Sequence, residues 1–259
     1  MGEWWRTDKR DRIAICTFER PPRNFMSFAA MTELESVLGG LAEDDSVHVV
    51  VLTGGVEGYF IAHADLEDLT KLGRGEHIEG DPTSWFRCLE LLEAIPQPTV
   101  AAINGQAHGG GCEISLACTL RLIAASGHMG QPEVLVGIIP GAGGTQRLPR
   151  LIGPGKAAEL ILSGRVVGAD EAVSIGLANA VLPDEDFLDH VTEWLQPIAR
   201  NTRSSLAAAK QALVEGMRST FEEGLRLEGR LFVELQTGEE ALDLQDATLE
   251  SYAKGSDPI

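Results

Sequence analysis

The sequence is poor in basic residues. It has 21 Lys and Arg against 39 Asp and Glu, so the formal net charge is −18. Because such a surface repels polyanions, we expect the protein to bind neither nucleic acid nor anionic membranes. It would also repel an anionic ligand at long range, and local basic groups or backbone amides would have to hold such a ligand.

Long apolar runs are also absent. No stretch reaches the roughly 18 residues that a membrane-spanning helix needs, and the N-terminal MGEWWRTDKRDR lacks the apolar core of a secretory signal. The hydrophobic fraction of 44% is ordinary for a globular protein, and 259 residues can bury a substantial core. We therefore expect a cytoplasmic protein made of one large domain or two small ones.

Cysteine is scarce, with four residues at positions 16, 88, 112 and 118. Their spacing is not that of paired metal ligands, so we expect reduced core thiols and no metal site. Cys112 lies beside an acidic residue, but nothing near it in the sequence would lower the pKa of its thiol. We therefore do not expect Cys112 to be a nucleophile.

The most informative stretch begins with an apolar run, PTVAAI at residues 98–103, which predicts a buried strand. Three glycines at 109–111 follow, and CEISLACTL after them predicts a buried helix. The free N–H groups of that helix's first turn favour negative charge, including transient charge on an oxygen. Residues 120–125 predict the next strand, and a second glycine-rich turn follows at 140–144.

This stretch carries two carboxylates. Glu113 falls in the first turn of the predicted helix, and Glu133 follows Pro132 twenty residues later. Strand, helix, strand and turn can bring both to one cavity, where they would serve as an acid and a base. In the alternative, Glu113 only complements the helix dipole and Glu133 only starts a helix. Spacing by itself leaves both interpretations open.

The block AAINGQAHGGGCEISLACTLRLIAASGHMGQPEVLVGIIPGAGGTQRLPRLIG resembles the core of the crotonase superfamily, specifically the enoyl-CoA hydratases. The likeness extends more weakly from Ile13 to about Leu235. It implies an α/β fold: a spiral of strand, strand, helix units over residues 1–199. A helical region at residues 200–259 would then make trimer contacts and cover the active site. The expected assembly is a homotrimer or a dimer of trimers.

The resemblance also implies a reaction. The expected activity is addition of water across the 2,3 double bond of an enoyl-CoA thioester, with no metal or redox cofactor because coenzyme A is part of the substrate. Enoyl-CoA isomerisation, another acyl-CoA reaction of the superfamily, or a non-catalytic acyl-CoA-binding subunit are the alternatives. Retention of both glutamates favours hydration.

The family's catalytic positions carry over to this sequence residue by residue. Glu133 is expected to transfer the proton at the α-carbon, while Glu113 holds and activates the water. The backbone N–H groups of Ala62 and Gly110 are expected to form an oxyanion hole for the thioester oxygen. Gly141 is expected to offer a backbone N–H beside the reactive water.

Two loops are expected to bind the coenzyme A part of the substrate. Arg23 and Asn24 lie in a strand-end loop that contributes to this site in the family, although Arg23 fits a solvated loop position equally well. The segment YFIAHADL matches a second family segment, and its residues Ala64, Asp65 and Leu66 are the expected contacts.

Two histidines depart from the family pattern. His63 stands where glycine is usual, and strain is expected if that position requires a positive φ. His108 stands where an apolar residue is common. Under one hypothesis both imidazoles line the acyl pocket and tune substrate choice; under the alternative, one or both point away.

Further helices are predicted by amphipathic spacing at residues 28–41, 84–94, 187–199, 203–217 and 220–236. By the resemblance, Trp85 in the second of these helices borders the acyl pocket, with ordinary core packing as the alternative. Beyond Thr237 no structure is predicted, and Tyr252 and Lys254 are the candidates for contacts with the nucleotide end of coenzyme A.

Overall fold

The computed structural model describes residues 2–256, whose strands form two sheets. The six-stranded sheet has the order β1 (Trp5–Arg10), β2 (Ile13–Phe18), β3 (Val49–Gly54), β5 (Thr99–Ile103), β7 (Leu120–Ala124), β10 (Ala180–Leu182). The four-stranded sheet has the order β4 (Gly58–Ile61), β6 (Gly105–His108), β8 (His128–Gly130), β9 (Val166–Gly168). An antiparallel hairpin joins β1 to β2, and β2, β3, β5, β7 and β10 run parallel.

The chain alternates between the two sheets. β3 is followed by β4, β5 by β6, and β7 by β8, and in each pair the first strand joins the large sheet and the second joins the small one. Asn104 lies between β5 and β6, where the chain passes from the large sheet to the small one. Its Nδ2 donates to the carbonyl oxygen of Gly54, where the chain leaves β3, at 2.8 Å. The predicted spiral of strand, strand, helix units is therefore confirmed.

Eleven α-helices and one 3₁₀-helix surround these sheets within residues 2–256. They are α1 (Phe28–Ala42), α2 (Leu66–Gly73), α3 (Ser84–Ala94), α4 (Gly110–Ala117), η1 (Glu133–Val136), α5 (Gly144–Ile152), α6 (Pro154–Ser163), α7 (Ala169–Ser174), α8 (Phe187–Ala199), α9 (Arg203–Gly216), α10 (Phe221–Gln236) and α11 (Glu239–Ala253). The helices predicted by periodicity are all present. Helices α2 and α11 and strands β4, β6, β8 and β9 were not predicted.

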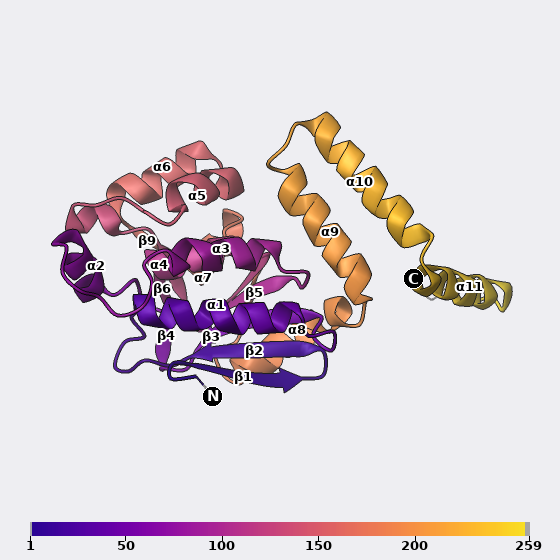
Figure 1. The fold of residues 1–259 in the computed structure, drawn as a ribbon, viewed down its shortest axis with the longest axis horizontal. Helices are drawn as coiled ribbons and strands as arrows, with labels where there is room; N and C mark the ends of the chain where they lie inside the picture. Colours follow the sequence, from indigo (N-terminus) through magenta and orange to yellow (C-terminus); the bar gives the residue numbers. More distant parts are fainter. Residues whose placement is uncertain (1, 257–259) are drawn as a thin grey trace.

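The central strands of the large sheet are buried on both faces, as their continuous apolar sequences require. One face packs against side chains of α1, α3 and α4, and the other packs against α8 (Figure 1). Every residue of β2, β3 and β5 is buried. No helix within residues 2–256 has both the length and the apolar character to cross a bilayer.

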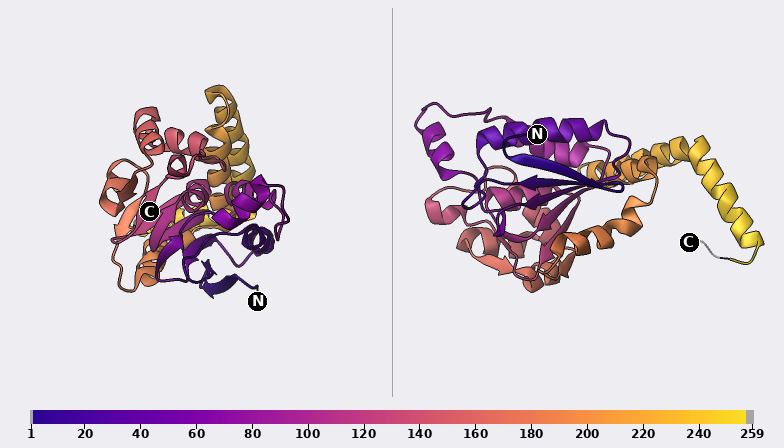
Figure 2. Two further views of the ribbon diagram at one scale, coloured as in Figure 1. Left: turned by 90° about the vertical axis from the view of Figure 1, so that its left-hand side faces the viewer. Right: turned by 90° about the horizontal axis from the view of Figure 1, so that it is seen from below.

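Helices α9, α10 and α11 extend away from the sheets, with α11 at the far end (Figures 1 and 2). Lys210 fastens α9 to the body, because its buried Nζ donates to the carbonyl oxygens of Leu92, Ile95 and Gln97 at 2.8 to 2.9 Å. The predicted boundary near residue 200 falls between α8 and α9. Its status as a domain boundary stays a prediction.

Candidate active site

A cavity of about 460 Å³ has Glu113 and Glu133 in its lining. Its walls come from α2, the start of α3, the start of α4, η1 and the loop that precedes α5. Most of the lining is aliphatic or aromatic, with residues such as Leu69, Trp85 and Ile139. The structure thus brings together two acids that are twenty residues apart in the sequence.

Glu113 lies in the first turn of α4 and is buried. Its Oε1 accepts hydrogen bonds from the backbone N–H groups of Ala142 at 2.7 Å and Gly144 at 2.8 Å. Burial raises the pKa of Glu113, while these two hydrogen bonds oppose the rise. The glycine-rich turn at residues 140–144 therefore fixes one oxygen of the carboxylate and leaves Oε2 for a ligand.

Glu133 begins η1 directly after Pro132 and is half-buried. Burial, with a smaller contribution from the charge of Glu113, raises the pKa of Glu133 to about 7. The buried Gln131 lies beside it: with its amide nitrogen turned toward the carboxylate, Gln131 donates to Oε1 at 2.8 Å and to Oε2 at 3.2 Å. The orientation of this amide is assigned from the hydrogen-bond network. Gln131 was not predicted, although it directly precedes Pro132 and Glu133.

All three consecutive glycines are required by close approach, and a Cβ built on Gly111 would lie 1.9 Å from the carbonyl oxygen of Ile61. Gly109 has φ of 50°, and a Cβ built on it would lie 3.2 Å from Oε1 of Glu133. A Cβ on Gly110 would lie 2.6 Å from Cζ2 of Trp85 and 3.2 Å from Cβ of Ala64. A side chain at Gly109 or Gly110 would therefore occupy space that Glu133 and Trp85 need.

The predicted oxyanion pair is wrong at Ala62. The Ala62 N–H donates to the carbonyl oxygen of Asn24 at 3.1 Å, and Ala62 is absent from the cavity lining. Ala64 is the better candidate, because within residues 2–256 its N–H, like that of Gly110, has no hydrogen-bond acceptor, and both residues line the cavity. The carbonyl of His63 and the N–H of Asp65 both bond to Met26.

This correction has a simple physical reason. Successive peptide groups of an extended segment point to opposite sides, so the Ala64 N–H points away from the neighbouring segment that holds its flanking groups. The motif contains two alanines, Ala62 and Ala64, and both are small enough to stand beside a ligand. Hydrogen-bond pairing distinguishes them, and pairing is not visible in the sequence.

Both unusual histidines line the cavity, as one of the two hypotheses expected. His63 does not have a positive φ, so the expected strain is absent. Its ring stacks on Phe25 with centroids 4.4 Å apart, and its Nδ1 donates to the carbonyl oxygen of Ala64 at 2.7 Å. Nε2 of His108 lies 2.8 Å from Nδ1 of His128. The effect of these rings on substrate choice stays a prediction.

Comparison with known proteins identifies the group to which this arrangement of acids and amides belongs. The model of the enoyl-CoA hydratase/isomerase family matches residues 8–253, which is most of the chain. The protein belongs to the enoyl-CoA hydratase/isomerase family. The predicted superfamily and the predicted crotonase fold are therefore confirmed.

The chain is similar to several members of the family. It is 37% identical to a short-chain-enoyl-CoA hydratase of Clostridium acetobutylicum, over 94% of this chain and 93% of that protein. It is 34% identical to a crotonyl-CoA hydratase of Syntrophomonas wolfei, over 87% and 86%. An enoyl-CoA hydratase structure from Bacillus anthracis matches with a TM-score of 0.89 and 33% identity, covering 99% of this chain and 98% of that one.

Some residues that were expected to contact coenzyme A instead stabilise the loops in which they lie. Asn24 is fully buried, with φ of 53°, and its Nδ2 donates to the carbonyl oxygens of Phe18 and Phe60 at 3.0 Å. A coenzyme A contact through the Asn24 side chain is therefore wrong, because both ends of its amide bond to the protein backbone. Asn24 instead fixes the loop that precedes α1.

Asp65 is corrected in the same way. Its carboxylate caps the N-terminus of α2 and pairs with Arg20 at 2.7 Å, so it holds the loop rather than a substrate. Leu66 and Ala64 do line the cavity. Arg23 is exposed in its loop, and its contact with coenzyme A stays a prediction.

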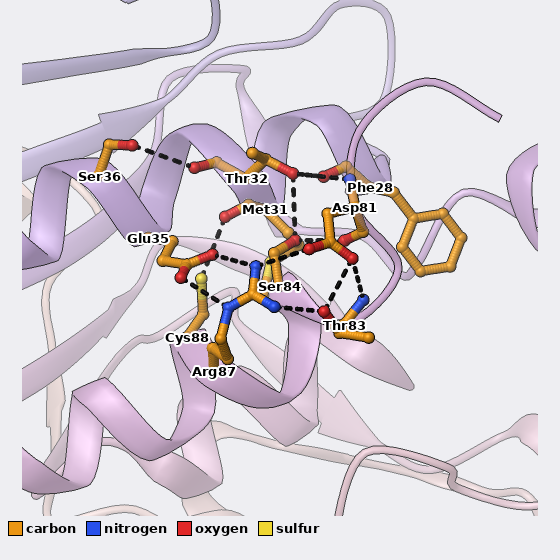
Figure 3. Close-up of polar contacts among 10 residues, drawn as sticks. All are labelled: Phe28, Met31, Thr32, Glu35, Ser36, Asp81, Thr83, Ser84, Arg87 and Cys88. Atoms are coloured by element: carbon orange, nitrogen blue, oxygen red, sulfur yellow. Dashed lines mark hydrogen bonds and ion pairs between the residues drawn. The ribbon is translucent and has the colours of Figure 1, made fainter.

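Trp85 lines the cavity and is also part of the core, so both interpretations of this residue apply. Helix α3, which carries it, is fastened to α1 by an ion-pair network (Figure 3). Arg87 Nε and Nη2 donate to the two oxygens of Glu35 at 2.6 and 2.7 Å, and Nη2 donates to Asp81 at 2.9 Å. The network therefore holds the loop before α3 and the indole that packs against Gly110.

The structure tests the predictions for the four cysteines but not the predicted contact of Gly141 with a water. Cys112 is buried, and burial raises the pKa of its thiol to about 12, which is the opposite of what a nucleophile needs. The cysteines at 16, 88 and 118 are also free and buried, as predicted. Gly141 lies in the cavity lining, while its contact with a water stays a prediction.

Proposed function

We propose that the protein is an enoyl-CoA hydratase, which adds water across the 2,3 double bond of an enoyl-CoA thioester. The observation that carries this proposal is the presence of two acids, Glu113 and Glu133, in one cavity beside two backbone amides that have no acceptor within residues 2–256. Family membership and the printed names of similar proteins, among them a 2,3-dehydroadipyl-CoA hydratase of Escherichia coli at 35% identity, support it.

The thioester carbonyl binds between the N–H groups of Ala64 and Gly110. Addition of hydroxide at C3 places negative charge on this oxygen, and backbone donors that are already oriented stabilise that charge. The Gly110 N–H belongs to the first turn of α4, where the helix dipole acts in the same direction. Donors of this kind are each worth about 10²–10³ in rate.

The two acids divide the proton transfers. Oε2 of Glu113 accepts a proton from the water whose oxygen bonds to C3, since Oε1 is already occupied by two amides. Glu133, whose raised pKa lets it hold a proton near neutral pH, donates that proton to C2. One C–O and one C–H bond form, the C=C π bond is lost, and a proton remains on Glu113. The reaction uses no metal or redox cofactor.

The proposal is tested by assaying the hydration of crotonyl-CoA, which is monitored as a loss of the enoyl absorbance. We expect turnover in the wild type and a decrease of about 10²–10⁴ in kcat for Glu113→Gln and for Glu133→Gln. Both variants should still bind butyryl-CoA, because the amides that hold the carbonyl are unchanged. Near-native turnover in either variant would refute the assigned roles.

Isomerisation is the second candidate, because it needs a proton shuttle but no water. A gain of enoyl absorbance from a 3-enoyl-CoA, without hydration of crotonyl-CoA, would establish it. Glu113 favours hydration, because its position on two amides leaves an oxygen for a water that isomerisation does not use. Binding of butyryl-CoA with neither reaction would indicate a non-catalytic subunit.

A further inference from the structure

Two histidines give the cavity a polar corner. Besides Glu113 and Glu133, its lining within residues 2–256 is aliphatic, aromatic or glycine, except for His63 and His108. A Cβ built on Gly109 would lie 3.8 Å from Cβ of His63 and 3.2 Å from Oε1 of Glu133. The polar corner therefore adjoins the acid that is proposed to act at C2.

Each ring has one nitrogen bonded to the protein and one that is unbonded. A carbonyl oxygen can only accept, so His63 Nδ1 carries a proton toward Ala64 and Nε2 of the neutral ring is an acceptor. His108 uses Nε2 for His128, and no residue in the described chain bonds to its Nδ1. Depending on which ring donates in the His108–His128 pair, His108 Nδ1 is a donor or an acceptor.

A plain alkyl chain in this corner would remove water from both free nitrogens without replacing its hydrogen bonds. A carboxylate is also unfavourable, because Glu113 and Glu133 already lie in the cavity and burial and the neighbouring histidines lower the pKa of His108 to about 4, so that its ring is uncharged. A hydroxyl group suits both rings when His108 Nε2 accepts from His128, since its single proton is donated to His63 Nε2 while its oxygen accepts from His108 Nδ1.

We propose that this protein prefers an enoyl-CoA whose acyl chain bears a hydroxyl group beyond C3, recognised by His63 Nε2 and His108 Nδ1. The inference rests on the proposed function, because it names the substrate class of the same site. His108 and His63 are specificity-determining residues in this reaction and take no part in the proton transfers.

The test compares enoyl-CoA thioesters of matched length. Hydration rates are measured for crotonyl-CoA against 4-hydroxy-2-butenoyl-CoA, and for 2-hexenoyl-CoA against 6-hydroxy-2-hexenoyl-CoA and 2,3-dehydroadipyl-CoA. We expect kcat/KM to be about tenfold higher for the hydroxylated member of at least one pair, which is the size of one hydrogen bond. A ratio near one in both pairs, or preference for the carboxylate, would overturn the proposal.

Three variants assign the preference to the rings. His108→Leu should abolish it by raising kcat/KM for the plain chain and lowering it for the hydroxylated one. His63→Asn keeps a donor for the Ala64 carbonyl, removes the acceptor Nε2, and should reduce the preference. His190→Leu, on α8 and outside the cavity lining, is the matched control and should leave the ratio unchanged. An unchanged ratio in both His108→Leu and His63→Asn would contradict the assignment.

A binding measurement separates this inference from the reaction itself. Dissociation constants of hexanoyl-CoA and 6-hydroxyhexanoyl-CoA, measured by calorimetry, require no turnover. Tighter binding of the hydroxylated thioester, lost in His108→Leu, would support the substrate class even if no hydration were observed. Hydration of crotonyl-CoA with equal binding of the two saturated thioesters would retain the proposed function and reject the inference.

Discussion

At the scale of residues, the reaction depends on how many protons Glu113 and Glu133 hold between them. Hydration requires Glu133 protonated and Glu113 ionised, whereas dehydration requires the reverse, so both directions use the pair with one proton. Since burial raises the pKa of Glu133 to about 7, the free enzyme loses this proton above neutral pH. At lower pH Glu113 gains a proton, and the pair holds two.

We therefore expect kcat/KM to decrease above pH about 7 for hydration and for dehydration alike. The profile is measured with crotonyl-CoA and with 3-hydroxybutyryl-CoA between pH 5.5 and 9, while circular dichroism checks that the fold is retained. A profile that stays flat from pH 6 to 9, or opposite slopes in the two directions, would show that the acids do not share one proton.

Some of the site could be predicted from residues and some could not. Glu113 and Glu133 were found because a carboxylate in a helical first turn and one after Gln-Pro are local patterns joined by a specific resemblance. The oxyanion amide was placed at Ala62 instead of Ala64, because an N–H is free or bonded according to tertiary pairing with the Asn24 loop. Asn24 and Asp65 were assigned to a ligand for the same reason.

At the scale of elements, Lys210 fastens helix α9 to the body of the protein. Its Nζ donates to three carbonyls at the end of α3 and in the following loop, and no carboxylate bonds to this buried ammonium group within the described chain. Lys210→Met would leave these carbonyls without their shared donor. We expect a loss of roughly 2 kcal/mol or more in the free energy of unfolding.

Urea denaturation measures this loss, with Lys156→Met as the control. Lys156 lies on the exposed face of α6 and pairs with Glu159, so its replacement should change stability by less than about 0.5 kcal/mol. Equal effects in the two variants would show that the three carbonyls find other partners when Lys210 is absent.

The elements themselves were predicted unevenly. Helices with a regular apolar face, such as α3 and α8, were predicted with the bounds that the structure shows. Strands β8 and β9 have three residues each, too few to show a period, and they form by pairing with strands distant in sequence. Helix α11 has no buried residue, and its few apolar side chains, such as Leu242 and Leu249, are too widely spaced to show a helical period.

At the scale of the whole molecule, the C-terminal helices leave apolar side chains exposed. They include Phe221, Phe232, Val233, Leu242 and Leu249, on α10 and α11, which extend away from the sheets (Figure 2). Several large apolar side chains exposed on the same helices are typical of a subunit interface. We propose that these helices join three copies into a homotrimer, or two such trimers into a hexamer.

Light scattering coupled to size exclusion tests the assembly. We expect a mass of three or six chains of 27.8 kDa for the wild type and a smaller species for the double variant Phe232→Glu, Leu249→Glu. The exposed Leu162, on α6 of the core, provides the control variant Leu162→Glu, which should keep the wild-type mass. A wild-type monomer would reject the trimer.

Helix α4 sets one distance in the reaction centre. Gly110 and Glu113 lie three residues apart in a single turn, which the hydrogen bond from the Glu113 N–H to the Gly109 carbonyl closes at 2.9 Å. The backbone spacing between the amide that binds the carbonyl and the acid that binds the water is thus set by the helical rise of about 1.5 Å per residue, while the N–H groups of Ala142 and Gly144 fix the carboxylate itself. Residues of the outer cavity wall can therefore vary to admit different acyl groups, while the spacing of Gly110 and Glu113 along α4 stays constant.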